Sequence, residues 1–263
     1  MKNKYLFLLM FFLIFASLFC NEQASVIPKR MAGIFGGMGP EATANLYQLV
    51  VSLTPAKKDQ EHIPTIIFSF PQVPDRTTAI INNNRAIIPY LVQGVQLLEK
   101  SGASFIAIPC NTAHYFYDEM QSAVNIPIIH MIRETVTEVI RINPMVKKIG
   151  ILATNGTIQT GLYESEFKKK GIKVLMPDAS VQKDCVMEAI AGIKAGIEKK
   201  RCTDLLAVAG RQLEEKGAEI IVLGCTEIPL AFDEKCVAVP VVNATRVLAK
   251  AIIHFYSKLG NDT

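Results

Sequence analysis

Short apolar, β-branched runs alternate with longer amphipathic segments along nearly the whole chain after Met31. Runs of about 4–8 residues suit strands and longer periodic segments suit helices, so the alternation predicts a parallel α/β fold. We expect strands at 32–35, 65–70, 105–108, 126–130, 148–152, 173–176, 219–223 and 237–242. The clearest helices are expected at 41–53, 85–100, 133–142, 159–170, 183–198, 204–216 and 245–259.

A weak internal repeat divides this pattern into two halves. The segment K-R-M-A-G-I-F-G-G-M-G leads to P-C-N-T at Cys110, and V-K-K-I-G-I-L-A-T-N-G-T leads, after a similar distance, to G-C-T-E at Cys225. Two pseudo-symmetric domains are predicted, each a parallel sheet flanked by helices, with the first at 31–131 plus 241–263 and the second at 132–240. Ligands gather at the carboxyl ends of parallel strands, so we expect a cleft with one thiol on each side.

Composition excludes several classes of protein. The 263 residues carry 28 Lys and Arg against 24 Asp and Glu, with no basic tract and no Trp, which argues against nucleic-acid binding. Six cysteines without a C-x-x-C pair are too sparse for a disulfide scaffold. The four histidines show no paired spacing, so no metal site is expected.

The N-terminus has the pattern of a secretory leader. Two lysines precede an apolar run at 5–19, which is shorter than the about 20 residues of a membrane-spanning helix. We therefore expect a signal peptide at about 1–24 and a periplasmic or exported protein. Two alternatives stay open: a lipoprotein anchored at Cys20, and a cytoplasmic protein whose translation starts at Met31.

A glycine-containing loop follows the first expected strand. Gly37-Met38-Gly39 with Ala42 satisfies G-x-G-x-x-A, the fingerprint of dinucleotide-binding loops. Pro40 suits the first turn of a helix, whose N–H groups could bind any small anion, including a carboxylate. Of the three interpretations, which are a dinucleotide site, a small-anion loop and a structural turn, we favour the small-anion loop.

Cys110 and Cys225 are the candidate catalytic residues. Each follows an apolar strand and precedes a segment that we expect to be a helix, whose N-terminus would lower the thiol pKa. A lone cysteine is more often a packing residue, but two at equivalent points of a repeat indicate function. Opposed thiols suit two-base proton transfer at carbon, in which one thiolate removes a Cα proton and the other thiol delivers one to the opposite face. We expect Cys185, Cys202 and Cys236 to be packing or surface thiols.

Three further side chains are candidates with ordinary alternatives. Arg76 in P-D-R-T could bind a carboxylate through its guanidinium or be a solvated loop arginine. Lys194 lies within an expected helix, where a solvent-facing lysine is typical. His114 follows Cys110 by one helical turn, which favours a packing or hydrogen-bonding role.

Five motifs together resemble those of the aspartate/glutamate racemase family, and most closely its aspartate racemase branch. They are G-G-M-G-P-E-A-T at 36–43, P-D-R-T at 74–77, P-C-N-T-A-H at 109–114, A-T-N-G-T at 153–157 and G-C-T-E-I-P-L at 224–230. The resemblance runs from about Met31 to Tyr256. It implies two α/β domains with the active site between them, independence from pyridoxal phosphate and any other cofactor, and a homodimer.

The resemblance also implies roles for individual residues. Cys110 and Cys225 would be the acid/base pair, and Arg76 and Lys194 would hold the substrate's side-chain carboxylate. The residues expected to bind the substrate are Met38, Arg76, Asn111, Thr112, Thr154, Lys194, Thr226 and Glu227.

The expected activity is interconversion of L- and D-aspartate, with glutamate as a second candidate. Glu227 stands where glutamate racemases of this superfamily carry histidine, which favours aspartate. An isomerase or decarboxylase of dicarboxylic acids is the enzymatic alternative. An exported protein that binds an acidic amino acid is the alternative without catalysis, although it gives the paired cysteines no role.

Overall fold

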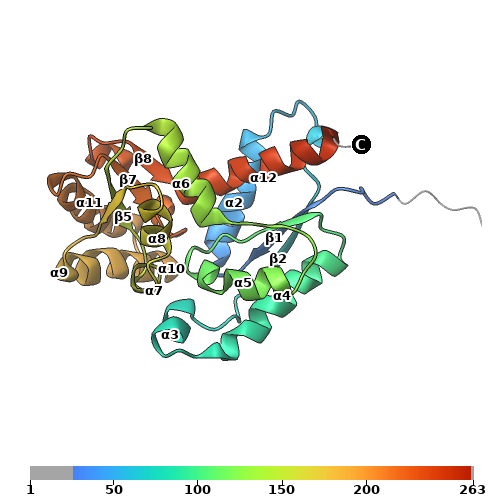
Figure 1. Cartoon of the computed structure of the whole chain (residues 1–263), viewed down its shortest axis with the longest axis horizontal. Coiled ribbons are helices and arrows are strands. Elements are labelled where there is room, and N and C mark those ends of the chain that lie inside the picture. Colours follow the sequence, from blue (N-terminus) through green and yellow to red (C-terminus); the bar gives the residue numbers. More distant parts are fainter. Residues whose placement is uncertain (1–25, 262–263) are drawn as a thin grey trace, which may run out of the picture.

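A computed structural model describes residues 26–261 and contains two four-stranded parallel sheets (Figure 1). Their strand orders, β2-β1-β3-β4 and β6-β5-β7-β8, are the same order of corresponding strands, so the sequence repeat is also a repeat of topology. The expected leader at 1–24, with Cys20, lies outside the described residues. The strands are β1 (Ala32–Gly36), β2 (Thr65–Ser69), β3 (Phe105–Ala107), β4 (Ile128–Ile129), β5 (Lys148–Leu152), β6 (Lys173–Leu175), β7 (Ile220–Leu223) and β8 (Val241–Asn243).

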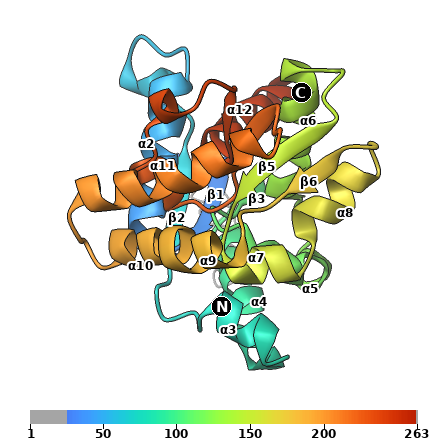
Figure 2. The same ribbon diagram turned by 90° about the vertical axis from the view of Figure 1, so that its left-hand side faces the viewer.

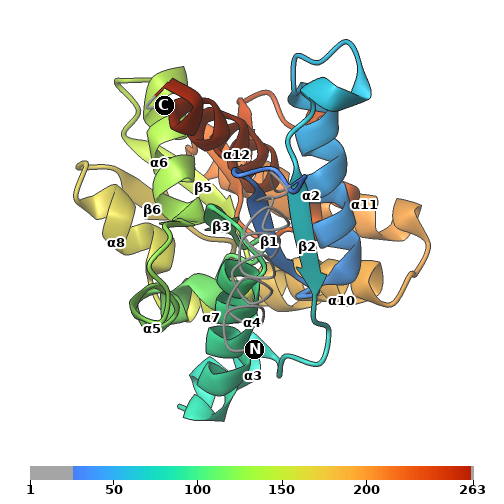
Figure 3. The ribbon, with the colours of Figure 1, turned by 90° about the vertical axis from the view of Figure 1, so that its right-hand side faces the viewer.

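Helices flank both sheets (Figures 2 and 3). Within residues 26–261, none of them combines the length and the apolar character needed to cross a membrane. Short 3₁₀ turns lie at 59–61, 85–87, 112–116, 228–230 and 234–236. The α-helices are α2 (Pro40–Leu53), α3 (Arg76–Ile81), α4 (Ile88–Lys100), α5 (Tyr117–Ser122), α6 (Met131–Ile142), α7 (Asn155–Gln159), α8 (Leu162–Lys168), α9 (Ala179–Val181), α10 (Glu188–Lys194), α11 (Lys199–Glu215) and α12 (Ala244–Asn261).

We call residues 26–130 the first half and residues 131–261 the second half. In each sheet, the helix that follows the last strand packs against the core of the other sheet. Helix α6 follows β4 of the first sheet, yet its buried Val136 and Val139 belong to the core around β5. Helix α12 follows β8 of the second sheet, yet its buried Leu248 and Ile252 belong to the core around β1 and β3. In Figure 1, α12 accordingly runs from β8 towards α2. The predicted domain boundaries at 131/132 and 240/241 stay predictions.

Several regular elements differ from the expected ones. The helix expected at 204–216 begins already at Lys199, and the strand expected at 126–130 is reduced to Ile128–Ile129. The last strand begins at Val241 rather than at 237, directly after Pro240, which has no N–H to donate to a sheet. The helix expected at 159–170 begins only at Leu162, as α8, because Gly161, whose φ is +61°, separates it from α7. The helix expected at 183–198 begins with a π-helical turn at 182–187 and ends at Lys194.

Candidate active site

The carboxyl ends of the central strands of both sheets meet at a pocket between the two halves. All ten residues that the sequence singles out for catalysis or substrate binding line this pocket. Two more, Asp75 and Thr77, flank Arg76 and were not predicted; only their position in the P-D-R-T motif could have indicated them. The pocket is lined by Met38, Asp75, Arg76, Thr77, Cys110, Asn111, Thr112, Thr154, Lys194, Cys225, Thr226 and Glu227.

Cys110 follows β3 and precedes a 3₁₀ turn at 112–116. Its side chain is 5% exposed, and its Sγ has no hydrogen-bond partner among residues 26–261. Its carbonyl accepts a hydrogen bond from Nδ1 of His114 at 2.8 Å, while Nε2 of His114 accepts from the N–H of Met131 at 3.1 Å. Burial lowers the pKa of His114, which suits a neutral ring in this position. His114 therefore ties the Cys110 loop to the start of α6.

Cys225 follows β7 and is likewise 5% exposed, but its surroundings differ. Its Sγ donates a hydrogen bond to Oε2 of Glu227 at 3.1 Å. Burial, together with the negative charge of Glu227, raises the pKa of the Cys225 thiol well above its usual value. The prediction of a lowered pKa is therefore wrong for Cys225, and the segment that follows it is a 3₁₀ turn, Ile228–Leu230, rather than the expected helix.

The glycine-containing loop after β1 holds a carboxylate of the protein itself. The N–H of Gly39 donates to Oε1 of Glu227 at 3.1 Å, and the N–H of Gly37 donates to Oγ1 of Thr43 at 2.8 Å. Gly39 is the residue that precedes α2, so its N–H lies at the positive end of that helix. The favoured interpretation as an anion loop therefore has an occupant within the chain, which is Glu227.

Arg76 is the first residue of α3 and is buried rather than solvated in a loop. Its Nη1 donates to the carbonyls of Val73 at 3.2 Å and Pro74 at 3.1 Å, and its Nη2 donates to the carbonyl of Met38 at 3.1 Å. Three carbonyls thus fix the plane of the guanidinium. Its buried Nε has no partner in the described part of the chain.

A second buried donor without a partner is Nδ2 of Asn111. The Oδ1 atom of the same side chain accepts from the hydroxyl of Tyr163 at 2.7 Å, which fixes the orientation of the amide. Buried polar groups are nearly always paired, and an unpaired one costs about 1–3 kcal/mol. Nε of Arg76 and Nδ2 of Asn111 are therefore two donors available to an acceptor bound in the pocket.

Lys194 supplies the other positive charge of the pocket from the exposed end of α10. The site also holds the carboxyl groups of Asp75 and Glu227, so its cations and acids are equal in number. Burial opposes ionisation of Asp75, but hydrogen bonds from Thr78 and the charges of Arg76 and Lys194 outweigh it, so the pKa of Asp75 lies below its usual value. Both cations therefore act on Asp75, and Lys194 also acts on Cys225.

Hydroxyl groups join the two halves beside the pocket. Oγ1 of Thr112 lies 2.9 Å from Oγ1 of both Thr154 and Thr157. Thr154 also caps the start of α7, where its side chain accepts from the N–H of Thr157 at 3.2 Å. On the other side, the hydroxyl of Thr226 donates to the carbonyl of Pro109 at 3.3 Å. These contacts join the two halves directly beside the residues that line the pocket.

Comparison with known proteins identifies the family to which the chain belongs. The family model of Asp/Glu/Hydantoin racemase matches residues 35–252. The chain belongs to the Asp/Glu/Hydantoin racemase family. Over 232 residues it is 32% identical to the broad specificity amino-acid racemase RacX of Bacillus subtilis (strain 168), which covers 86% of this chain and 98% of that protein.

Solved structures agree with the family. The aspartate racemase of Picrophilus torridus superposes with a TM-score of 0.78 at 28% identity, over 87% of this chain and 94% of that chain. An aspartate racemase homologue from Pyrococcus horikoshii OT3 gives a TM-score of 0.70 at 25% identity, over 86% and 99% of the two chains. The expected fold, two α/β domains with parallel sheets, is thus confirmed as that of the racemase family.

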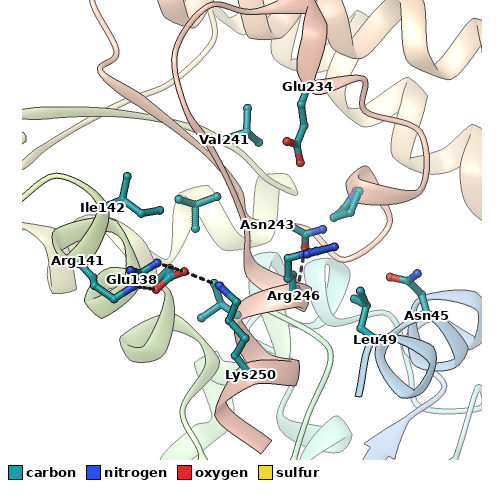
Figure 4. A pocket seen from close by; sticks show the side chains of 13 residues that line it. Asn45, Leu49, Glu138, Arg141, Ile142, Glu234, Val241, Asn243, Arg246 and Lys250 are labelled. Carbon is teal, nitrogen blue, oxygen red and sulfur yellow. Dashed lines mark hydrogen bonds and ion pairs between the residues drawn. The ribbon is translucent and has the colours of Figure 1, made fainter. Parts of the chain in front are cut away.

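A second, larger pocket lies where α2, α6 and α12 meet, and it contains no thiol (Figure 4). Glu138 lies there between Arg141 and Lys250, and its carboxylate accepts hydrogen bonds from both. These contacts, against the opposing effect of burial, lower the pKa of Glu138 to about 2. The pair Glu138 and Lys250 joins α6 to α12, which indicates a structural role for this region of the racemase fold.

The remaining cysteines lie away from the pocket between the halves. The five cysteines at 26–261 all carry free thiols, and Cys202 packs in the core of the second half. Cys185 and Cys236 are partly exposed. Over the same range, no group of three or more His, Cys, Asp or Glu side chains is arranged to hold a metal ion.

Proposed function

We propose that the protein is an aspartate racemase that uses Cys110 and Cys225 as opposed acid and base, without a cofactor. The observation that carries the proposal is that two thiols from equivalent strand ends line one pocket between the halves. Membership of a racemase family and the likeness to an aspartate racemase support it.

Each proton transfer balances within the pair of thiols. The thiolate of one cysteine takes the Cα proton, and the thiol of the other gives its proton to the opposite face of the carbanion, so the centre inverts and the two sulfurs exchange protonation states. The next turnover in the opposite direction uses the same two groups. No step needs an oxidant or a further reactant.

The carbanion also needs its carboxylate charge held in a site shielded from water. Nδ2 of Asn111 is a buried donor with its orientation fixed by Tyr163, which suits this role. Nε of Arg76 is the second such donor, and with Lys194 it gives the site two cations for a substrate with two carboxylates. Aspartate is a small substrate with this arrangement of charge.

The test is proton NMR of the reduced protein with L-aspartate in D₂O, with chiral analysis of the product. Loss of the Cα proton together with formation of D-aspartate, with no added pyridoxal phosphate, is expected. The C110A/C225A double variant is the control. Because one relative is named as broad in specificity, glutamate, alanine, lysine and arginine are assayed in parallel. Racemisation of another amino acid but not aspartate would overturn the substrate, and binding of aspartate without exchange would overturn the activity.

A further inference from the structure

Glu227 connects one of the two thiols to the opposite half of the molecule. We propose that Glu227 is a positioning residue that keeps the Cys225 thiol protonated in the resting protein. Because the same carboxylate also binds the opposite half, the protonation of Cys225 depends on the contact between the halves. In this state Cys110 is the base and Cys225 is the acid. This inference rests on the proposed racemase function and adds a direction to it.

The geometry gives each carboxylate oxygen its own contact. Oε2 accepts from Sγ of Cys225 at 3.1 Å, and Oε1 accepts from the N–H of Gly39 at 3.1 Å. The hydroxyl of Thr226 lies 3.4 Å from Oε2 and 3.3 Å from the carbonyl of Pro109, between which its single proton is shared. The side chain of Glu227 is only 4% exposed, so water does not replace these partners. The thiol is thus held as a donor.

The Gly39 contact fixes where the carboxylate lies. A Cβ placed on Gly39 would lie 3.1 Å from Oε1, closer than ordinary van der Waals contact, so the absence of a side chain allows this approach. Gly39 belongs to the first half and Glu227 to the second. Separation of the halves would therefore remove the Gly39 N–H from Oε1 and leave the carboxylate, which accepts from Cys225, held by contacts within the second half alone.

The other groups that face Cys225 do not cancel this effect. Burial and the charge of Glu227 raise the pKa of Cys225, whereas Lys194, at the exposed end of α10, lowers it. The phenol of Tyr163 is a further titratable neighbour, and burial raises its own pKa, so it stays uncharged. The Cys110 thiol, Asp75 and Arg76 line the same pocket, but none of them hydrogen-bonds to Sγ of Cys225. The balance favours the protonated thiol.

The first half contains no equivalent of Glu227. The position two residues after Cys110 is Thr112, a neutral hydroxyl that bonds to Thr154 and Thr157. Sγ of Cys110 has no hydrogen-bond partner in the described part of the chain. The two thiols therefore occupy equivalent places in the fold but differ in what holds their protons.

The direct test is the pH dependence of alkylation at each cysteine. The reduced protein is treated with iodoacetamide from pH 6 to pH 10, and modification of Cys110 and Cys225 is followed peptide by peptide by mass spectrometry. In E227Q an amide replaces the charged acceptor, and we expect the midpoint for Cys225 to fall by about one pH unit or more, which is about tenfold faster alkylation below the midpoint. The midpoint for Cys110 should stay in place.

Two further variants and two spectroscopic measurements make the test selective. E227D keeps the charge on a shorter side chain and should lie between wild type and E227Q. E234Q makes the same chemical change at an acid of the other pocket and should leave both midpoints unchanged. Far-UV circular dichroism checks folding. The absorbance at 240 nm sums all thiolates, so the difference between its pH titrations for E227Q and wild type gives the change independently of access by the reagent. An unchanged Cys225 midpoint in a folded E227Q would overturn the proposal.

Steady-state kinetics supply a second readout that a purely structural role would not change. The equilibrium constant of a racemisation is one, so kcat/KM must be equal in the two directions whichever thiol holds the proton. The asymmetry must therefore appear in kcat and KM separately, and E227Q should change the ratio of the two KM values several-fold with a compensating change in kcat. A shifted midpoint without racemisation of any amino acid would sustain the role of Glu227 and overturn the proposed function; racemisation with an unshifted midpoint would do the reverse.

Discussion

The two halves of the molecule have the same topology but differ at the chemistry. Each sheet places a cysteine after its third strand in chain order, on the two sides of one pocket. Two residues after Cys110 stands a neutral hydroxyl, that of Thr112, whereas two residues after Cys225 the buried carboxylate of Glu227 accepts a hydrogen bond from the thiol. A repeated fold therefore supplies two bases on opposite faces of a substrate, while single side chains decide which of them starts as the acid.

The same comparison holds for the contacts that join the halves. Thr112 and Glu227 each stand two residues after a cysteine, and each reaches the loop after the first strand of the opposite half, at Thr154 and Gly39. One contact is between hydroxyls and the other is between a carboxylate and a helix N-terminus. The position is repeated, whereas the residue type at it is not.

The largest expected effect comes from removing either thiol. C110A and C225A should each lower racemisation by about 10³-fold or more, because the reaction needs one group on each face and a positioned acid or base contributes about 10²- to 10⁴-fold. Chiral analysis of aspartate over time measures both variants. C185A removes a partly exposed cysteine away from the pocket and is the matched control. Full activity of either single variant would show that only one of the two thiols is needed, and would contradict the proposal that both halves supply a catalytic group.

The next effect concerns the cation of the first half. R76K should lower kcat/KM by about 10²-fold, since lysine cannot donate to three carbonyls and present a further donor at the same time. The kcat and KM for aspartate are measured together with the thermal midpoint. If R76K kept wild-type kcat/KM, the guanidinium would have no part in holding the substrate.

The cation of the second half should matter less. Lys194 is exposed at the end of α10, where its charge is screened by solvent and salt. K194Q should lower kcat/KM about three- to tenfold, and the difference from wild type should shrink as NaCl rises from 20 to 500 mM. An effect as large as that of R76K, or one independent of salt, would contradict the distinction between the buried and the exposed cation.

The repeat and the strand-end cysteines could be predicted from the sequence because they depend on local pattern. Apolar runs of strand length indicate which segments form the strands of a sheet. Residues directly after such runs lie at the carboxyl edge of the sheet, independently of the other elements of the fold. The pocket therefore contains both predicted cysteines. Boundaries that depend on a single backbone angle, as at Gly161, could be assigned only from the structure.

The protonation of the thiols could not be predicted in the same way. It depends on contacts between residues far apart in the chain, such as the bond between Glu227 and Gly39, which no sequence pattern encodes. The same is true of the burial of Arg76, which depends on carbonyls from two separate loops. The sequence indicates which residue types reach the pocket, and the packing of the halves decides their charge.

The smallest expected effect concerns the two places where the chain crosses between the halves. Helix α6 begins after His130, whose Nδ1 accepts from the N–H of Arg133 at 3.4 Å. Helix α12 begins after Asn243, whose Oδ1 accepts from the N–H groups of Thr245 at 2.9 Å and Arg246 at 3.1 Å. The capping side chain of α6, His130, takes up a proton as the pH falls, whereas that of α12, Asn243, does not.

Burial, with smaller contributions from the neighbouring His114 and from the charge of Arg133, lowers the pKa of His130 from 6.5 to about 3. Between these values the unfolded chain binds a proton that the folded chain does not, so His130 makes the protein less stable as the pH falls from 6.5 towards 3. H130N keeps a capping acceptor without the titration, and its free energy of unfolding should therefore fall less steeply. Urea unfolding between pH 6.5 and 4.5 lies above the range in which Glu138, with its pKa of about 2, loses its contribution to stability. The lowered pKa of His114 acts in this window in both proteins, so the difference in slope between wild type and H130N reports His130. N243A, in contrast, should lose about 1 kcal/mol at every pH with the slope of wild type; equal slopes for wild type and H130N would show that the two crossings respond to acid alike.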